Sequence, residues 1–507
     1  MSKSSTSCEL PAGFPGTVGL KFNEPLIFER SVPGRIGHSL PALDVPTANP
    51  ALYVEPELLR GEAPALPEVS EIDAVRHFHR LSGWNYAVDS GMYPLGSCTM
   101  KYNPRVNEAT SRLPGLARLH PLQPVQTAQG ALSLMHELSS MLAEISGMHA
   151  VTLQPAAGAH GEFSGLLMIR AYHTSRGNPR SKVLIPDSAH GTNPASAALC
   201  NYKPIELKSG PDGLLDPYTV AAAMDEEVAA LMITNPNTLG LFERNILEIA
   251  KIVHDKGGLI YCDGANLNAL MGAAKPAHFG ADVLHFNLHK TFSTPHGGGG
   301  PGSGPVGVVE ALEPFLPSPV VVKSQRDGAD YYELDYDRPQ SVGRVKAFYG
   351  NFLVMVRAYT YIRELGGEGL TRSTQMAVLN ANYVKERLKE VFSVAHDATC
   401  MHECVFSEQS LVEHGCHTMD LAKRLIDYGY HPPTVYFPLI VKGAIMIEPT
   451  ESESVESLEQ FIEAMLAIQR EAQTDPELLH SAPHCTRLGR LDEVRAVKDL
   501  DVRWTKR

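Results

Sequence analysis

The sequence contains no uninterrupted run of about 18 apolar residues, the length that a membrane-spanning helix requires. Its start, MSKSSTSCEL, includes no apolar core of the kind found in signal peptides, so we expect no secretion signal. Basic residues are not in excess, because 44 Lys and Arg stand against 57 Asp and Glu, for a formal net charge of −13. No basic surface for nucleic acid is therefore expected. These absences predict a cytoplasmic protein that binds neither a membrane nor a nucleic acid.

A recognisable metal-binding pattern is also missing from the cysteines. The eight cysteines are scattered along the chain. The nearest approach to a cluster is Cys400-Met-His-Glu-Cys404 with Cys416-His417, and its spacing matches no usual zinc pattern. We therefore predict no metal site, and we expect reduced thiols, as in cytosolic proteins.

The composition is that of an ordinary globular protein. The 507 residues are 43% hydrophobic and 20% charged, which is enough chain for two or three domains. The organisation we predict is an extended, proline-rich N-terminal arm over 1–75, a large α/β domain over 76–345, a smaller α+β domain with bridging helices over 346–470 and a C-terminal tail over 471–507. Two roles are open for the arm, which either wraps a partner subunit or is disordered.

Strands and helices alternate through the large domain. The predicted strands are nearly continuous apolar runs, as expected when helices cover both faces of a sheet. This alternation predicts an α/β fold with a mainly parallel sheet. The predicted strands are 150–154, 182–185, 228–233, 258–262 and 283–286, and the predicted helices are 129–145, 161–172, 193–199 and 246–256. For the smaller domain we predict helices over 347–364, 373–392, 418–428 and 454–470, with strands at 404–406 and 444–448.

Each strand of the large domain ends in a polar or glycine-bearing turn. In parallel sheets, functional sites lie beyond the carboxyl ends of the strands. The turns are 155–160, 186–193, 234–237, 263–266 and 287–290. We therefore expect the functional residues of the large domain at this edge. A loop at 86–104, dense in hydroxyl groups and containing Lys101, is a further functional candidate, or else a plain connection.

Lys290 follows the strand at 283–286 and precedes a loop with seven glycines between 297 and 307. A lysine at the end of a buried strand is costly unless it is paired, has a lowered pKa or forms a Schiff base. Glycines let the main chain approach a ligand closely. These features indicate a carbonyl cofactor such as pyridoxal phosphate. The alternative is a strand-end lysine that reaches solvent beside a surface loop.

Other residues match the remaining needs of pyridoxal phosphate. Asp263, 27 positions before Lys290, either partners the pyridine nitrogen or caps a helix. Gly158 and Ala159 precede a predicted helix, whose N-terminus binds anions. His160 either lies over the cofactor ring or belongs to a helix cap. The glycine loop lacks the Gly-Lys-Ser/Thr ending of a nucleotide-binding P-loop.

Five separated segments together resemble the glycine-cleavage P-protein family, whose members are pyridoxal-phosphate glycine dehydrogenases (decarboxylating) of fold type I. The segments are YPLGSCTMK (93–101), PAAGAHGE (155–162), SAHGTNPAS (188–196), NLHKTF (287–292) and IEPTESE (447–453). The resemblance extends from about residue 80 to 490. Full-length members have two homologous halves, and only the second half holds the lysine. This chain is one half long and carries Lys290, so it is similar to subunit 2 of the split bacterial form.

The resemblance implies decarboxylation of glycine on pyridoxal phosphate and transfer of the aminomethyl group to the lipoyl arm of H-protein, with release of CO2. It implies a separate subunit 1 as the partner, in an α2β2 heterotetramer. Two alternatives stay open. One is another fold type I amino-acid decarboxylase or lyase, and the other is a non-catalytic subunit that docks H-protein.

The resemblance also assigns roles by motif position. Lys290 is implied as the Schiff-base lysine and Asp263 as the partner of the pyridine nitrogen, while His160 stacks on the ring. His190 and His289 are implied as further catalytic residues, and His289 acts either in proton transfer or as a hydrogen-bonding support. The remaining implied cofactor contacts are Gly158, Ala159, Ala265 and Thr291, and the implied substrate contacts are Ser97, Thr99, Lys101, Thr192 and Asn193.

Overall fold

The computed structural model describes residues 24–297 and 300–505, and it divides into two compact units. Unit 1 comprises Met1–Ala87, Ile426–Gly429 and Ser481–Arg507, and unit 2 comprises Val88–Leu425 and Tyr430–His480. The division into four segments made from the sequence stays a prediction. No helix among the described residues is long and apolar enough to cross a membrane.

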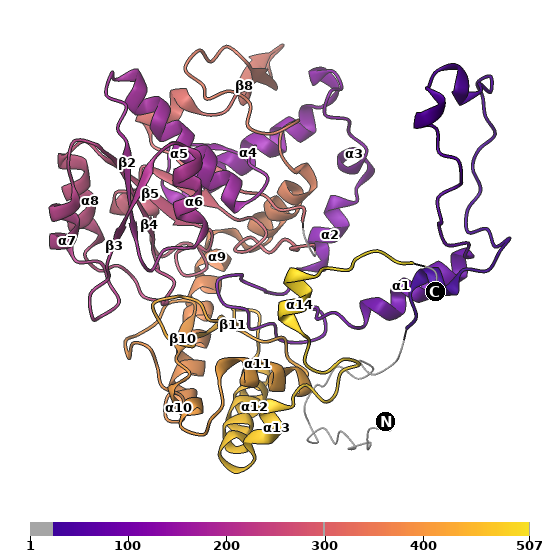
Figure 1. The fold of residues 1–507 in the computed structure, drawn as a ribbon. Coiled ribbons are helices and arrows are strands. Elements are labelled where there is room, and N and C mark those ends of the chain that lie inside the picture. The colour runs from indigo at the N-terminus through magenta and orange to yellow at the C-terminus, as the bar shows by residue number, and fades with distance from the viewer. Residues whose placement is uncertain (1–23, 298–299, 506–507) are drawn as a thin grey trace. The chain divides into compact units, whose positions relative to one another are not determined.

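A seven-stranded sheet with the strand order β1-β7-β6-β5-β4-β2-β3 forms the centre of unit 2. Its strands β2, β3, β4 and β5 are labelled in Figure 1. Only β7 runs antiparallel to its neighbours, β1 and β6, so the predicted mainly parallel sheet is confirmed. The bounds are β1 Ala150–Thr152, β2 Lys182–Pro186, β3 Lys203–Leu207, β4 Val228–Thr234, β5 Leu259–Gly264, β6 Val283–Phe286 and β7 Val306–Val308. β3 and β7 were not predicted from the sequence, because β3 mixes polar and apolar residues without a clear period and β7 follows the glycine loop.

Apolar side chains pack on both faces of this sheet, because neighbouring residues of a strand point to opposite sides. On one face, Leu231 and Ile260 join a buried cluster with residues of α4, α8 and α9. On the other face, Met232 and Tyr261 pack with residues of α5 and α6. Gly165 of α5 lies so close that an added Cβ would come within 2.5 Å of the Tyr261 ring. The helices are α4 Gln129–Ser146, α5 Gly158–Ser175, α6 Thr192–Leu199, α7 Pro217–Ala223, α8 Ile246–Asp255 and α9 Phe352–Leu388.

A second, smaller antiparallel sheet has the order β10-β12-β11. Its strands are β10 Cys404–Phe406, β11 Thr434–Val435 and β12 Ile445–Ile447, and the helices that follow α9 in this part of the chain are α10 Gln409–Val412, α11 Thr418–Asp427, α12 Val455–Thr474 and α13 Pro476–His480. The predicted smaller α+β domain is confirmed in its element types. The two helices predicted at 347–364 and 373–392 form the single span α9, with non-helical backbone at Gly366 (φ 61°).

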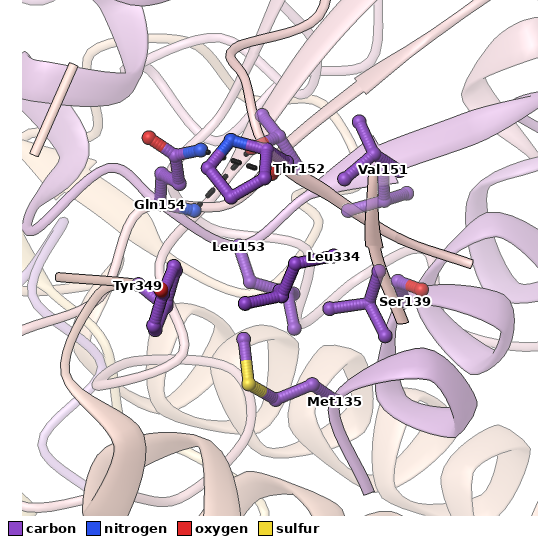
Figure 2. Close-up of a pocket in the computed structure, with 11 residues that line it drawn as sticks. Met135, Ser139, Val151, Thr152, Leu153, Gln154, Leu334 and Tyr349 are labelled. Atoms are coloured by element: carbon purple, nitrogen blue, oxygen red, sulfur yellow. Dashed lines mark hydrogen bonds between the residues drawn. The ribbon is translucent and has the colours of Figure 1, made fainter. Parts of the chain in front are cut away.

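A two-stranded hairpin, β8 Val320–Arg326 and β9 Ala329–Asp335, was not predicted and packs against α4. Beneath it lies a cavity of about 40 Å³ lined mainly by apolar side chains, including Met135 and Leu334 (Figure 2). Gln154 closes one side by donating from Nε2 to the carbonyl of Pro319 at 3.2 Å. This volume admits one or two water molecules, so the cavity is a packing feature and not a cofactor site.

Unit 1 contains the described part of the predicted arm, which is largely extended with the short 3-10 turns η1 Ile27–Arg30, η2 Pro50–Leu52 and η3 Pro56–Leu58. Residues 1–23 of that prediction lie outside the described residues. Buried Glu24 joins the arm to helix α1 (Glu71–Ser82) by accepting hydrogen bonds from Arg80 at 2.5 Å and His77 at 2.8 Å. The last helix is α14, Glu493–Lys498.

The cysteines do not form the cluster considered above. Cys416 groups with Asp420 and His480, and this group includes neither Cys400 nor Cys404. Six of the cysteines in the described part of the chain are free thiols: Cys98, Cys200, Cys262, Cys400, Cys404 and Cys416. The expectation of reduced thiols is wrong at Cys485, which is disulfide-bonded.

Candidate functional site

The carboxyl ends of the parallel strands meet at one edge of the seven-stranded sheet, as predicted. Asp263 is the second-last residue of β5, and Lys290 follows the end of β6 by four residues. The register pairs Asp263 with His285 on β6. Two residues that are 27 positions apart in sequence therefore come from neighbouring strand ends.

Lys290 is 9% exposed and points into the protein. Its Nζ donates a hydrogen bond of 2.7 Å to the carbonyl oxygen of Ser97. Ser97 and Thr99 both have left-handed backbone, with φ of 65° and 42°, which bends the loop and directs this carbonyl. The alternative of a strand-end lysine reaching solvent is therefore wrong.

Asp263 is buried in a set of hydrogen bonds that favours its charged form. Its two oxygens accept from Ala265 N at 2.9 Å and from Asn193 Nδ2 at 3.1 Å, and His285 Nε2 lies 3.4 Å away. Burial acts to raise the pKa of Asp263, but His285, Ala265 and Asn193 together outweigh it and lower the pKa below its usual value. A buried, ionised carboxylate results, and it caps the local turn at Ala265, not a helix.

The N-terminus of α5 is free of a capping side chain, because the N-cap residue Ala157 makes no side-chain hydrogen bond. Its first backbone N–H groups, at Gly158 and Ala159, form the kind of site that binds a phosphate. A Cβ on Gly158 would lie 2.7 Å from Oδ1 of Asn287, so only glycine fits there. That Asn287 oxygen is itself buried without a hydrogen-bond partner. A carboxamide oxygen accepts hydrogen bonds, so only a donor group seated here would satisfy it.

His160, the third residue of α5, is held by the turn that precedes the helix. Its Nδ1 accepts a hydrogen bond of 3.1 Å from Ala156 N. Burial lowers the pKa of His160, and a hydrogen bond with the backbone of Val345 partly opposes that shift. The ring is therefore held neutral and in a fixed orientation, as a stacking partner needs to be.

His289, beside Lys290, accepts a hydrogen bond of 3.2 Å from Ser303 N through its Nδ1. Burial, with additional repulsion from His296 and Lys290, lowers the pKa of His289 to about 3. A neutral ring that accepts a backbone hydrogen bond is consistent with the second predicted role of His289, that of a hydrogen-bonding support. Its part in proton transfer stays a prediction.

Glu162 organises the turn that contains His190 and Thr192. It accepts from Thr192 Oγ1 at 2.7 Å and from Ser196 Oγ at 2.9 Å. Thr192 Oγ1 also lies 2.9 Å from Nδ1 of His190. Asn193 donates to Asp263 with Nδ2, while its Oδ1 is buried without a partner. The substrate roles of these residues stay predictions.

Two other predicted contacts are engaged with the protein itself. Thr291 Oγ1 accepts from Leu267 N at 2.9 Å. Lys101 is buried and donates to Glu451 at 2.7 Å and to Tyr361 and Asn268 at 3.1 Å each. Burial acts to lower the pKa of Lys101, but Glu451 and Tyr361 outweigh it and raise the pKa. Lys101 thus ties the 86–104 loop to the segment after β12.

Glu403, Glu448 and His402 were not predicted as site residues, yet their side-chain ligand atoms lie within 4.8 Å of one another. Ser97 N donates to Glu403 at 2.8 Å, and Thr99 Oγ1 donates to Glu448 at 2.7 Å. Glu448 lies within the IEPTESE segment, and Glu403 lies in the stretch considered for a metal. Both segments therefore stood out in the sequence, but the sequence did not show that Glu403 and Glu448 lie next to each other in the fold.

One sheet edge thus offers a buried lysine, an ionised carboxylate and an uncapped helix N-terminus. This donor set fits pyridoxal phosphate, which needs an amine, a partner for its ring nitrogen and an anion site. These three groups come from different elements, namely β5, the segment after β6 and the N-terminus of α5, which the fold brings to one edge of the sheet.

Known proteins match this chain over nearly its whole length. The chain is 56% identical over 485 residues to "Probable glycine dehydrogenase (decarboxylating) subunit 2" of Halalkalibacterium halodurans, covering 96% of this chain and 99% of that one. It is 56% identical over 488 residues to the protein of the same name in Caldanaerobacter subterraneus subsp. tengcongensis, covering 96% and 100%.

The chain belongs to the glycine dehydrogenase (decarboxylating) subunit 2 family. The predicted resemblance is confirmed. A family model for the glycine dehydrogenase C-terminal domain matches residues 373–484, and one for class-V aminotransferases matches residues 162–309. A crystal structure titled glycine decarboxylase (P-protein) of the glycine cleavage system has a TM-score of 0.71 at 21% identity, covering 82% of this chain and 94% of that one. The predicted fold type I architecture is confirmed. Pyridoxal phosphate is the cofactor of this chain, as membership of the family implies.

Proposed function

We propose that this chain catalyses the decarboxylation of glycine with pyridoxal phosphate and the transfer of the aminomethyl group to the lipoyl arm of H-protein, with release of CO2. The observation that carries the proposal is the buried amine of Lys290 at the sheet edge, with Asp263 on the neighbouring strand. Membership of the subunit 2 family gives the reaction class.

Lys290 would bind the carbonyl group of the cofactor covalently, and Asp263 would pair with the pyridine nitrogen. The backbone of Gly158 and Ala159 would hold the phosphate, with His160 over the ring. Ala265 and Thr291 complete the predicted cofactor contacts. When bound, pyridoxal phosphate supplies an electron sink for the electron pair that is left when CO2 departs.

The residues of the chain prepare the site for this chemistry. Asp263, whose pKa is lowered, keeps a negative charge where a protonated ring nitrogen needs one. Neutral His160 offers a flat face without adding charge. Ser97, Thr99 and Lys101 from one loop, and Thr192 and Asn193 from the α6 turn, form the proposed substrate end, with His190 and His289 beside them.

The family name implies a partner, subunit 1, and we propose an α2β2 assembly in the cytoplasm. Unit 1 carries a surface suited to such a partner. Ile72, Val75 and Phe78 recur every three residues on one side of α1 and are 59%, 61% and 60% exposed. Further exposed apolar residues lie in the arm, among them Leu40, Leu43 and Leu52. Apolar groups in such number are typical of an interface.

The assembly proposal is tested with Phe78→Glu, which places a charge within the exposed side of α1. We expect loss of co-purification with subunit 1, whereas His79→Glu, at a neighbouring exposed position, retains it. Equal binding by both variants would exclude this surface as the interface.

The reaction is tested by glycine-dependent exchange of labelled bicarbonate with the purified chain, subunit 1 and lipoylated H-protein. We expect exchange only when H-protein is present. CO2 release from glycine without H-protein, or turnover of a larger amino acid, would instead favour another fold type I decarboxylase or lyase. A chain that docks H-protein but does not change its absorption with borohydride would be a non-catalytic subunit.

A further inference from the structure

Two buried carboxyl groups face each other beside the amine of Lys290. Strands β10 and β12 pair antiparallel with Cys404 opposite Ile447, so Glu403, just before β10, is the neighbour of Glu448, just after β12. Glu403 is 3% exposed and Glu448 is fully buried. Like charges directly opposite one another on paired strands destabilise a sheet, and burial increases that cost.

The two groups hold opposite ends of one short turn. Glu403 accepts from the backbone N–H of Ser97 at 2.8 Å. Glu448 accepts from the N–H of Thr99 at 3.1 Å and from its Oγ1 at 2.7 Å. Asn266 Nδ2 also donates to both oxygens of Glu448, at 2.9 and 3.0 Å. The carbonyl of Ser97, within this turn, accepts the hydrogen bond from Lys290.

The turn depends on these carboxyl groups because its backbone is unfavourable on its own. Ser97 and Thr99 are left-handed residues without being glycine. Gly96, next to them, packs so closely on β12 that an added Cβ would lie 2.7 Å from the carbonyl oxygen of Met446. The small-domain strands therefore set the position of the carbonyl that meets Lys290.

The charges around the pair determine how many protons it binds. Burial and the charge of Glu448 raise the pKa of Glu403, and burial also raises the pKa of Glu448 against its hydrogen bonds from Thr99 and Asn266. Lys290 acts to lower the pKa of both. Two titratable neighbours add no charge, because burial lowers the pKa of His402 to about 3, which keeps the ring neutral, and raises the pKa of Cys98, which keeps the thiol protonated.

We propose that Glu403 and Glu448 act as positioning residues, sharing one proton at neutral pH and holding the Ser97–Thr99 turn against the amine of Lys290. Two carboxyl groups in one buried site cannot both ionise readily. Glu448, with its several donors, keeps the negative charge, and Glu403, with one donor, keeps the proton. The pair's single negative charge then matches the single positive charge of Lys290. Only the catalytic use of this turn rests on the proposed function.

The proton is tested by difference infrared spectroscopy of the full chain without cofactor. The wild type is expected to show the C=O stretching band of a protonated carboxyl group at about pH 8, above the pKa of Glu448 of about 7, and Glu403→Gln is expected to lack it. Glu243→Gln is the matched control, because Glu243 is a buried carboxyl whose pKa is raised by burial to about 6 and which lies in the turn before α8. It should retain the band at about pH 8, where Glu243 itself is ionised. Absence of the band in the wild type, or its persistence in Glu403→Gln, would overturn the shared proton.

The positioning role is tested by the rate at which added pyridoxal phosphate attaches to the chain, followed by absorbance. Glu448→Gln removes the charged acceptor of the hydrogen bonds from Thr99 and Asn266. The attachment rate of this variant should therefore be at least tenfold lower than that of Glu243→Gln. Equal rates for these two variants would contradict the role. Neither measurement uses glycine or H-protein, so failure of the proposed reaction would leave both results interpretable.

Discussion

The ammonium group of Lys290 donates a hydrogen bond of 2.7 Å to the carbonyl oxygen of Ser97, which lies 193 residues earlier in the chain. This contact joins the end of β6 to a loop that precedes the whole sheet. Within 24–297 and 300–505, no carboxylate forms an ion pair with this buried amine, whose partner is a neutral carbonyl. An amine bound to a neutral carbonyl is not locked in an ion pair, which suits a group that is to react with a cofactor.

Replacing Asp263 with Asn tests the electrostatic part of the site. The amide oxygen of Asn can still accept one of the bonds from Ala265 and Asn193, but the negative charge is lost. We expect glycine–bicarbonate exchange to fall by several orders of magnitude with the fold intact, as judged by circular dichroism. Asp216→Asn is the control, because Asp216 caps α7 and Asn caps helices equally well. An unchanged exchange rate in the Asp263 variant would show that Asp263 is not the carboxylate that pairs with the pyridine nitrogen.

Gly96→Ala tests the close packing of the loop on β12. The added Cβ would lie 2.3 Å from Cγ and 2.7 Å from the carbonyl oxygen of Met446. We expect a loss of about 1–3 kcal/mol in the free energy of unfolding, the usual cost of overpacking. Gly91→Ala meets nothing within 4 Å and should leave stability nearly unchanged. Denaturant unfolding of the two variants measures the difference, and similar stabilities would contradict the packing.

Lys101→Met separates a structural role of Lys101 from substrate binding. Removing the ammonium leaves the partly buried carboxylate of Glu451 without its cation. Breaking a buried ion pair in this way costs about 3–5 kcal/mol. Adding Glu451→Gln should recover part of that loss. If stability is unchanged and only the KM for glycine rises, Lys101 serves the substrate instead.

The stability of the chain should depend on His289 in acid. Burial lowers the pKa of His289 from 6.5 to about 3, so the neutral ring is favoured in the folded state. Its contribution is present above pH 6.5 and is lost as the pH falls through about 3. At about 1.4 kcal/mol per pKa unit, the contribution is on the order of 5 kcal/mol.

The matching variant is His289→Asn, whose Oδ1 can still accept from Ser303 N but cannot become charged. Its free energy of unfolding should fall less steeply than that of the wild type between pH 6.5 and 3. His149→Asn, at an exposed position, should follow the wild type. Parallel curves for wild type and His289→Asn would show that the ring is not buried in its neutral form.

The sequence predicted the sheet well because its parallel strands are short apolar runs between helices, a local pattern. It predicted Lys290 and Asp263 for the same reason, since each follows such a run. It did not predict β7, whose three residues follow a loop of glycine and proline. It also gave no role to Glu403 and Glu448, because they meet only through the pairing of β10 with β12. Long-range pairing of this kind leaves no periodic signal in the chain.

The most direct test of the account is to add pyridoxal phosphate to the assembled chain, reduce it with borohydride and locate the modified residue by mass spectrometry. We predict a single major label on Lys290, with loss of the visible absorption band. Lys290→Ala should bind subunit 1 normally and show neither the label nor glycine–bicarbonate exchange. A label on Lys101 or any other lysine, or full exchange by Lys290→Ala, would contradict the central role of Lys290.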